Sequence, residues 1–91
     1  MRHATPDALD RLEPLLAKLR LVDGLVERKR GTFYRKSNAT LHFHEDPSGL
    51  YADVKVAGEW QRLRATTAAE QRALLRTVEA VVTPSSPPGS A

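Results

Sequence analysis

Hydrophobic and polar residues alternate through the middle of the chain, from Leu25 to Ala65. A period of two is typical of strands that bury one face, and turn residues interrupt it at 37–38, 46–49 and 58–59. We therefore predict an antiparallel meander of four strands, with the following ranges: 32–36, 39–45, 50–57 and 60–65. The weaker alternation over 25–30 marks a candidate fifth strand at the edge of the sheet.

Apolar residues recur at helical spacing before and after this region. The first helix has Thr5 as its N-cap and Pro6 in its first turn, and its leucines form one stripe. Pro14 removes a helix hydrogen bond, so the helix either kinks or properly begins there. Thr67 and Glu70 form a capping box that starts the second helix. Its apolar residues are Leu74, Leu75, Val78, Val81 and Val82.

These elements predict a single α+β domain. An antiparallel sheet with two amphipathic helices forms a two-layer sandwich in the order α-β-β-β-β-α, with both helices on one face. The 91 residues suffice for one domain. We assign residues 1–82 to this domain and residues 83–91, which are rich in Pro, Ser and Gly, to a disordered tail.

The turn at 46–49 sets the register of the central hairpin. With Gly49 in a left-handed conformation, Phe43 faces Ala52 and Leu41 faces Val54, so that apolar residues meet. The same reasoning gives these partners across the other turns: Val54 with Leu63, Ala52 with Ala65, Tyr34 with Leu41 and Thr32 with Phe43.

This register leaves the second face of the sheet uncovered and predicts a basic and aromatic surface on it. Aromatic rings on a sheet stack unpaired bases, and Arg and Lys neutralise phosphates. We therefore expect a nucleic-acid-binding face, formed by Phe33, Arg35, Tyr51, Lys55, Trp60, Arg62 and Arg64. The structural alternative is a hydrated sheet face whose aromatic–basic pairs only stabilise strand pairing. Lys55 directly opposite Arg62 is unfavourable for a sheet alone, which favours a functional role.

The charge of the chain points in the same direction. Its net charge is +3, its pI is about 9.7, and residues 28–36 contain no acid. Such a run attracts polyanions, and it also keeps a sheet edge from aggregating. The secondary basic patch is Arg28, Lys29, Arg30 and Lys36.

His42 and His44 lie two apart on one strand, so both rings project from one face, with Asp53 opposite His42. That spacing can hold zinc, with Asp53 as third ligand or as an orienting group. The structural alternative is a His42–Asp53 ion pair, which would raise the pKa of His42, beside a His44–Tyr51 contact. We expect the structural alternative, and therefore no metal and no other cofactor.

No enzymatic motif is present. The chain has no cysteine, no G-x-S-x-G elbow, no P-loop and no dinucleotide-binding glycine pattern. We therefore expect a non-enzymatic binding module. The alternative to nucleic acid is a protein partner or a second copy that buries the same face around Trp60. Neither a signal-like start nor an apolar span is visible, so we expect a cytoplasmic protein without a membrane partner.

The stretch "RGTFYRKSNATLHFHEDPSGLYADVKV", followed by "RLRATTAAEQRALL", resembles small uncharacterised bacterial proteins of high-GC genomes. More loosely, "TFYRK", a tight turn and "ATLHF" after an N-terminal helix are similar to the MmcQ/YjbR group. The likeness covers residues 15 to 75. It implies a small α+β fold and a DNA-binding role near the basic strands, and it carries over no catalytic residue.

Overall fold

A computed structural model describes residues 1–82 of the chain. Its elements are β1 (Arg2–His3), α1 (Pro6–Leu19), β2 (Leu25–Lys29), β3 (Thr32–Arg35), β4 (Asn38–Asp46), β5 (Gly49–Val56), β6 (Glu59–Arg64) and α2 (Ala68–Val82). The predicted α+β architecture is confirmed, and the candidate fifth strand is β2. The expected disordered tail lies outside the described residues. No helix in the described part is long and apolar enough to cross a membrane.

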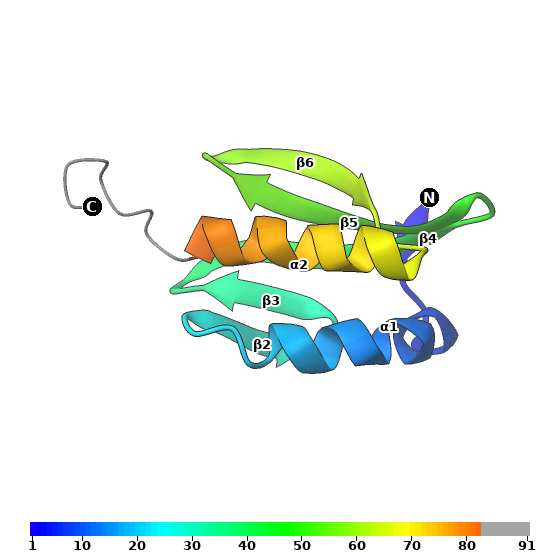
Figure 1. The fold of residues 1–91 in the computed structure, drawn as a ribbon, viewed down its shortest axis with the longest axis horizontal. Helices are drawn as coiled ribbons and strands as arrows, with labels where there is room; N and C mark the ends of the chain where they lie inside the picture. Colours follow the sequence, from blue (N-terminus) through cyan, green and yellow to red (C-terminus); the bar gives the residue numbers. More distant parts are fainter. Residues whose placement is uncertain (83–91) are drawn as a thin grey trace.

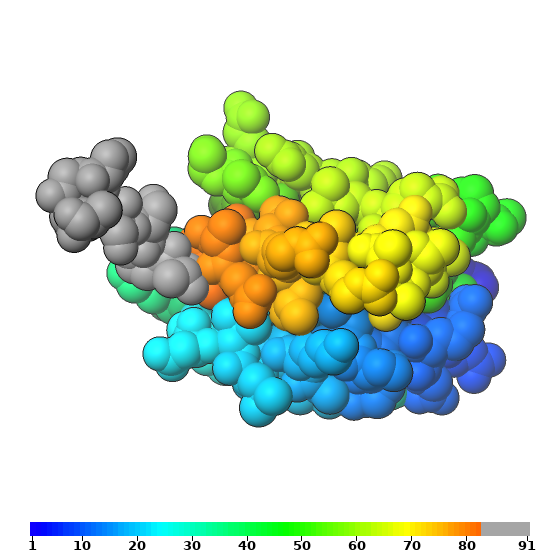
Figure 2. Space-filling model, viewed as in Figure 1, coloured from blue at the N-terminus to red at the C-terminus, as the bar shows by residue number. Residues whose placement is uncertain are grey.

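The sheet is antiparallel, with the strand order β2-β3-β4-β5-β6. The short strand β1, which the sequence pattern did not predict, pairs with the end of β4 that β3 leaves free. Both helices run in the same direction across one face, and the other face carries no helix (Figure 1). In Figure 2, α2 covers the middle of the helix-bearing face and β6 extends beyond it.

The core lies between the helices and the sheet. Fully or nearly fully buried members are Leu12, Leu15, Leu16 and Leu19 of α1, Leu74, Val78 and Val82 of α2, and Phe33, Leu41, Phe43, Ala52 and Val54 of the strands. Burial of each large apolar side chain contributes roughly 1.5–3 kcal/mol. The two predicted apolar stripes are therefore what fixes the helices to one side of the sheet.

The helix α1 passes through Pro14 rather than beginning there. Thr5 is its N-cap, and the Thr5 Oγ1 accepts a hydrogen bond from the Ala8 N–H at 3.4 Å. Pro14 is exposed, so the carbonyl of Asp10, which loses its helix partner, lies on the solvent side. Water can satisfy that carbonyl, and the leucines on the opposite side keep the helix continuous.

The predicted register of the central hairpin is confirmed. Phe43 pairs with Ala52, and the turn ends at Gly49, whose φ is 143°. A Cβ at Gly49 would lie 2.5 Å from the Oγ1 of Thr66. That hydroxyl is fixed, because it accepts from the Leu50 N–H at 2.9 Å and donates to the Leu50 carbonyl at 3.2 Å. Glycine is therefore required by the close approach as well as by the turn.

The predicted turn between β5 and β6 was wrong by one residue. The two turn residues are Ala57 and Gly58, with φ values of 52° and 83°, instead of 58–59. Two successive positive φ angles are the geometry of a type I′ turn, which suits the twist of a hairpin. The pairing shifts by two residues, so every side chain stays on its predicted face and only its neighbours change.

The new neighbours explain why this register is favourable. Arg62 faces Asp53 instead of Lys55, and Lys55 faces Trp60. An unfavourable pair of like charges is thus replaced by an ion pair and by an aromatic–cation pair.

The predicted register between β3 and β4 was also wrong. Phe33 pairs with Leu41 and Tyr34 with Ala39, which leaves Thr40 as an extra residue in a bulge. Phe33 is 0% exposed and belongs to the core, so its predicted place on the uncovered face is incorrect. The bulge lets β3 bury the phenyl ring and turn the hydroxyl-bearing Tyr34 outward, where its polar group stays hydrated.

Candidate binding face

The uncovered side of the sheet is the candidate site, and we call it the open face. Strand alternation, together with the burial of Phe33 on the other side, assigns residues to it. Its members are His3, Val26, Arg28, Thr32, Tyr34, His42, His44, Asp46, Tyr51, Asp53, Lys55, Trp60, Arg62 and Arg64. Five of the seven residues predicted for a nucleic-acid face are among them: Tyr51, Lys55, Trp60, Arg62 and Arg64.

A cation lies over each of the three aromatic rings that are not histidine. The distances to the ring centroids are 4.7 Å for Arg28 over Tyr34, 5.2 Å for Arg64 over Tyr51 and 5.7 Å for Lys55 over Trp60. Trp60 is 46% exposed on the edge strand, so part of its ring is open to a ligand. The open face therefore combines flat rings with positive charge along its length.

Asp53 lies in the middle of the open face. Asp46, the other acid that strand alternation places there within the described residues, lies at the end of β4 and pairs with the N-terminal amine at 3.5 Å. The Nε and Nη2 of Arg62 donate to the two carboxylate oxygens of Asp53 at 2.8 and 3.0 Å. These bonds hold the pKa of the nearly buried Asp53 below its usual value. The carboxylate is thus ionised and neutralised by Arg62, which leaves the face with a net positive charge.

Arg64 connects three parts of the molecule. Its Nη1 donates to the Tyr51 hydroxyl at 2.8 Å, its Nε to Glu70 at 3.1 Å and its Nη2 to the Ser48 carbonyl at 3.3 Å. The side chain therefore joins β6 to the β4–β5 turn and to the start of α2. Arg64 therefore stabilises the fold in addition to contributing positive charge to the open face.

Three histidines gather at the centre of the open face. β1 pairs with β4 so that His3 lies opposite His44, and His42 is two residues away on β4. The ring centroids are 4.9 Å apart for His3 and His44 and 4.8 Å apart for His42 and His44. One ring nitrogen from each residue lies within 4.8 Å of the others. His3 could not be predicted from the sequence pattern, because a two-residue strand carries no periodicity.

The predicted His42–Asp53 ion pair is replaced by a diagonal contact. The Nε2 of His44 lies 2.9 Å from an Asp53 oxygen, although its N–H direction does not make a hydrogen bond. The pKa of His42 is lowered by its burial, and the neighbouring His44 lowers it further, so the expected rise is wrong. Burial outweighs the carboxylate, which is already engaged by Arg62.

The secondary basic patch is not one surface. Arg28 lies on the open face, whereas Arg30 turns to α1 and pairs with Asp10 and Glu13, both at 2.9 Å. Lys29 is exposed at the end of β2. The alternation of the hairpin separates residues that the sequence shows as one basic run.

Arg35 and Lys36 lie at the other end of the sheet. Arg35 pairs with the core residue Leu25 and so projects from the helix-bearing face, which corrects its predicted place on the open face. Lys36 occupies the β3–β4 turn, which falls at 36–37 instead of 37–38, with a φ of 58°.

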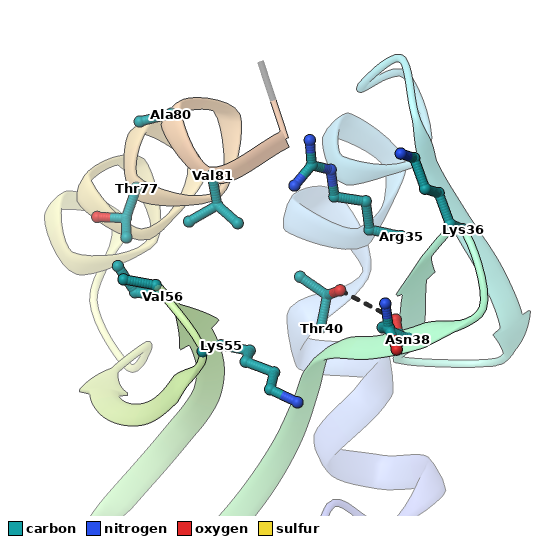
Figure 3. A pocket seen from close by; sticks show the side chains of 11 residues that line it. Arg35, Lys36, Asn38, Thr40, Lys55, Val56, Thr77, Ala80 and Val81 are labelled. Atoms are coloured by element: carbon teal, nitrogen blue, oxygen red, sulfur yellow. Dashed lines mark hydrogen bonds between the residues drawn. The ribbon is translucent and has the colours of Figure 1, made fainter. Parts of the chain in front are cut away.

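These two cations border a hollow of about 850 Å³ beside the last turns of α2. Lys55, Val56 and Val81 also line it, and none of its lining residues is acidic. In Figure 3, Arg35 extends toward the end of the helix, whereas Lys55 points away from it. Positive charge thus continues from the open face around this end of the sheet.

No family model matches the chain, and no curated protein or solved structure is detectably similar to it. The resemblance to the MmcQ/YjbR group therefore stays a prediction.

Proposed function

We propose that the open face binds single-stranded nucleic acid. The observation that carries the proposal is the set of three aromatic rings, each beside a cation, on a sheet face whose two acids in residues 1–82, Asp53 and Asp46, pair with Arg62 and with the N-terminal amine. Stacking of one base on an aromatic ring contributes about 1–3 kcal/mol, and the cations draw in the phosphates.

The shape of the face favours a single strand over a duplex. The open face carries no helix that could enter a major groove (Figure 1). Bases of a single strand are free to turn toward the rings, where they replace the cation or stack on its guanidinium plane. The Arg or Lys side chain that a base displaces from its ring stays close to the phosphate of that nucleotide.

Arg28 and Lys55 are the best residues for a test. Both contact an aromatic ring, and neither forms an ion pair with a carboxylate in residues 1–82. The double variant Arg28→Gln/Lys55→Gln therefore removes charge without releasing a buried partner. Arg72→Gln/Arg76→Gln is the matched control, because these exposed arginines lie on α2, across the molecule.

Binding is measured as fluorescence anisotropy of labelled oligo(dT), oligo(U) and a DNA duplex, in a chelating buffer over a series of salt concentrations. We expect tighter binding of the single strands and a steep loss with salt. Removing two phosphate contacts should weaken binding and reduce the salt slope by about 1.4, at about 0.7 for each contact on a single strand. Trp60→Leu should weaken binding by about tenfold or more.

The proposal fails if no probe binds at about 50 mM salt, where phosphate contacts are strong. It also fails if the control pair reduces the affinity as much as the open-face pair does. Sedimentation of the free chain checks the competing use of this face. A salt-independent dimer that Trp60→Leu converts to monomer would assign the face to self-association instead.

A further inference from the structure

The histidine cluster has features that neither packing nor the proposed nucleic-acid binding explains. All three histidines of the chain belong to it, and they come from two strands that are far apart in the sequence. The Nδ1 of His42 is buried without a hydrogen-bond partner among residues 1–82, and the buried Nε2 of His44 lies 2.9 Å from Asp53 without an N–H direction that makes a hydrogen bond. Buried polar atoms are nearly always paired, so an unpaired ring nitrogen of His42 beside two other imidazoles needs a reason.

The donor set identifies the class of ligand. Imidazole nitrogens without thiolates suit zinc and the neighbouring divalent transition metals. Three protein ligands with one position left for water form a common zinc arrangement. We propose that His3, His42 and His44 together bind one divalent metal ion of the zinc class.

The three histidine rings must move slightly closer together to bind one metal ion. The ring nitrogens lie within 4.8 Å of one another. In a tetrahedral zinc site with bonds of about 2.0–2.1 Å, two ligand nitrogens are about 3.4 Å apart. His3 is exposed and lies on a strand of two residues, so its ring can move toward the other two. His42 and His44, fixed on the long strand β4, already face the same side.

Asp53 completes the site as a positioning residue. Its carboxylate lies 2.9 Å from the Nε2 of His44, and Arg62 holds it in place with two hydrogen bonds. When the Nδ1 of His44 binds the metal, its Nε2 carries the proton and can turn to donate a hydrogen bond to this carboxylate. A carboxylate behind a ligating histidine fixes the ring and makes it a better ligand.

Trp60 provides a direct readout. It is the single tryptophan of the chain, and its ring centroid lies 4.9 Å from that of His42. The untagged full chain is titrated with Zn²⁺ and with Co²⁺ in the absence of nucleic acid. We expect one ion per chain by calorimetry, quenching of Trp60 by Co²⁺, and shifts of all three histidine ring signals by NMR with Zn²⁺.

The variant His3→Gln removes an exposed ligand, and Arg2→Gln on the same strand is its control. We expect His3→Gln to abolish tight binding and Arg2→Gln to leave it unchanged. Asp53→Asn should weaken zinc binding by about 10–100-fold while binding still occurs. Its urea unfolding curve shows whether the variant is folded.

The proposal is overturned if Zn²⁺ and Co²⁺ do not bind, or if His3→Gln binds them as the parent chain does. These outcomes are independent of the nucleic-acid experiment, which is done with chelator present. Either proposal can therefore fail without the other.

Discussion

Phe33 and Tyr34 are adjacent residues that differ by one hydroxyl group, and they lie on opposite faces of the sheet. The phenyl ring is fully buried against the helices, and the Tyr34 ring lies beneath Arg28. Which of the two rings is buried decides which side of β3 contributes to the core. It also decides that Tyr34, with Arg28 above it, belongs to the open face and that Arg35 does not.

Substitution of each ring by alanine tests this choice. We expect Phe33→Ala to reduce the free energy of unfolding by about 3–5 kcal/mol, because it leaves a cavity in the core. Tyr34→Ala should cost about 1 kcal/mol or less, because it removes a partly exposed contact. Urea unfolding followed by circular dichroism measures both. The reverse ranking would show that the register of β3 is the one predicted from the sequence.

At the scale of the element, α2 begins with a capping box that was predicted from four residues of sequence. The Thr67 Oγ1 accepts from the Glu70 N–H at 3.1 Å, and the Glu70 carboxylate accepts from the Thr67 N–H at 2.9 Å. Glu70 also accepts from the Thr66 N–H at 3.0 Å and from Arg64 at 3.1 Å. One local motif thus joins the start of α2 to the end of β6.

Thr67→Ala removes one half of this motif. We expect a loss of about 1 kcal/mol in the free energy of unfolding, since a helix N–H then lacks its acceptor. The control is Thr77→Ala in the same helix, where the hydroxyl donates to the Ala73 carbonyl within the helix. That change should be neutral or slightly stabilising, because alanine is the better helix former. Equal losses in the two variants would contradict a capping role for Thr67.

At the scale of the whole molecule, ionised carboxylates join elements that are distant in the sequence. Glu13 of α1 pairs with Arg20 and with Arg30 of the β2–β3 turn, and Glu45 of β4 accepts from the Thr5 N–H at the start of α1. Hydrogen bonds from Arg20 and Arg30 lower the pKa of Glu13 to about 2. The bond to Thr5 likewise lowers the pKa of Glu45.

These pKa shifts predict how the free energy of unfolding depends on pH. The pKa of folded Glu13 lies below its ordinary value of 4.5, so its contribution is fully present above that pH and is lost as the pH falls toward 2. We expect the urea midpoint to fall through this range, and to fall less steeply in Glu13→Gln. Glu79→Gln, an exposed change without an ion pair in the described chain, should follow the parent curve. If the urea midpoint of Glu13→Gln fell with pH as steeply as that of the parent chain, Glu13 would not contribute to the acid dependence.

Local signals in the sequence determined the class of fold and the faces of β4, β5 and β6. Glycine at position 49, with apolar partners on both sides, gave the register of β4 and β5, and Thr67 and Glu70 gave the start of α2. Each of these depends on contacts between residues close together in the chain. Along a strand without a bulge, a pattern of period two also assigns the face of each side chain without knowledge of its neighbours.

Tertiary structure alone decided which residues meet on the open face. A shift of two residues leaves the alternation unchanged, so the sequence could not distinguish Arg62 beside Lys55 from Arg62 beside Asp53. The bulge at Thr40 reverses the faces of β3, and its cause is how the core packs. His3 reaches His42 and His44 only because the chain end pairs with β4. Such long-range pairing is selected by the energy of the complete sheet and core, which no local pattern contains.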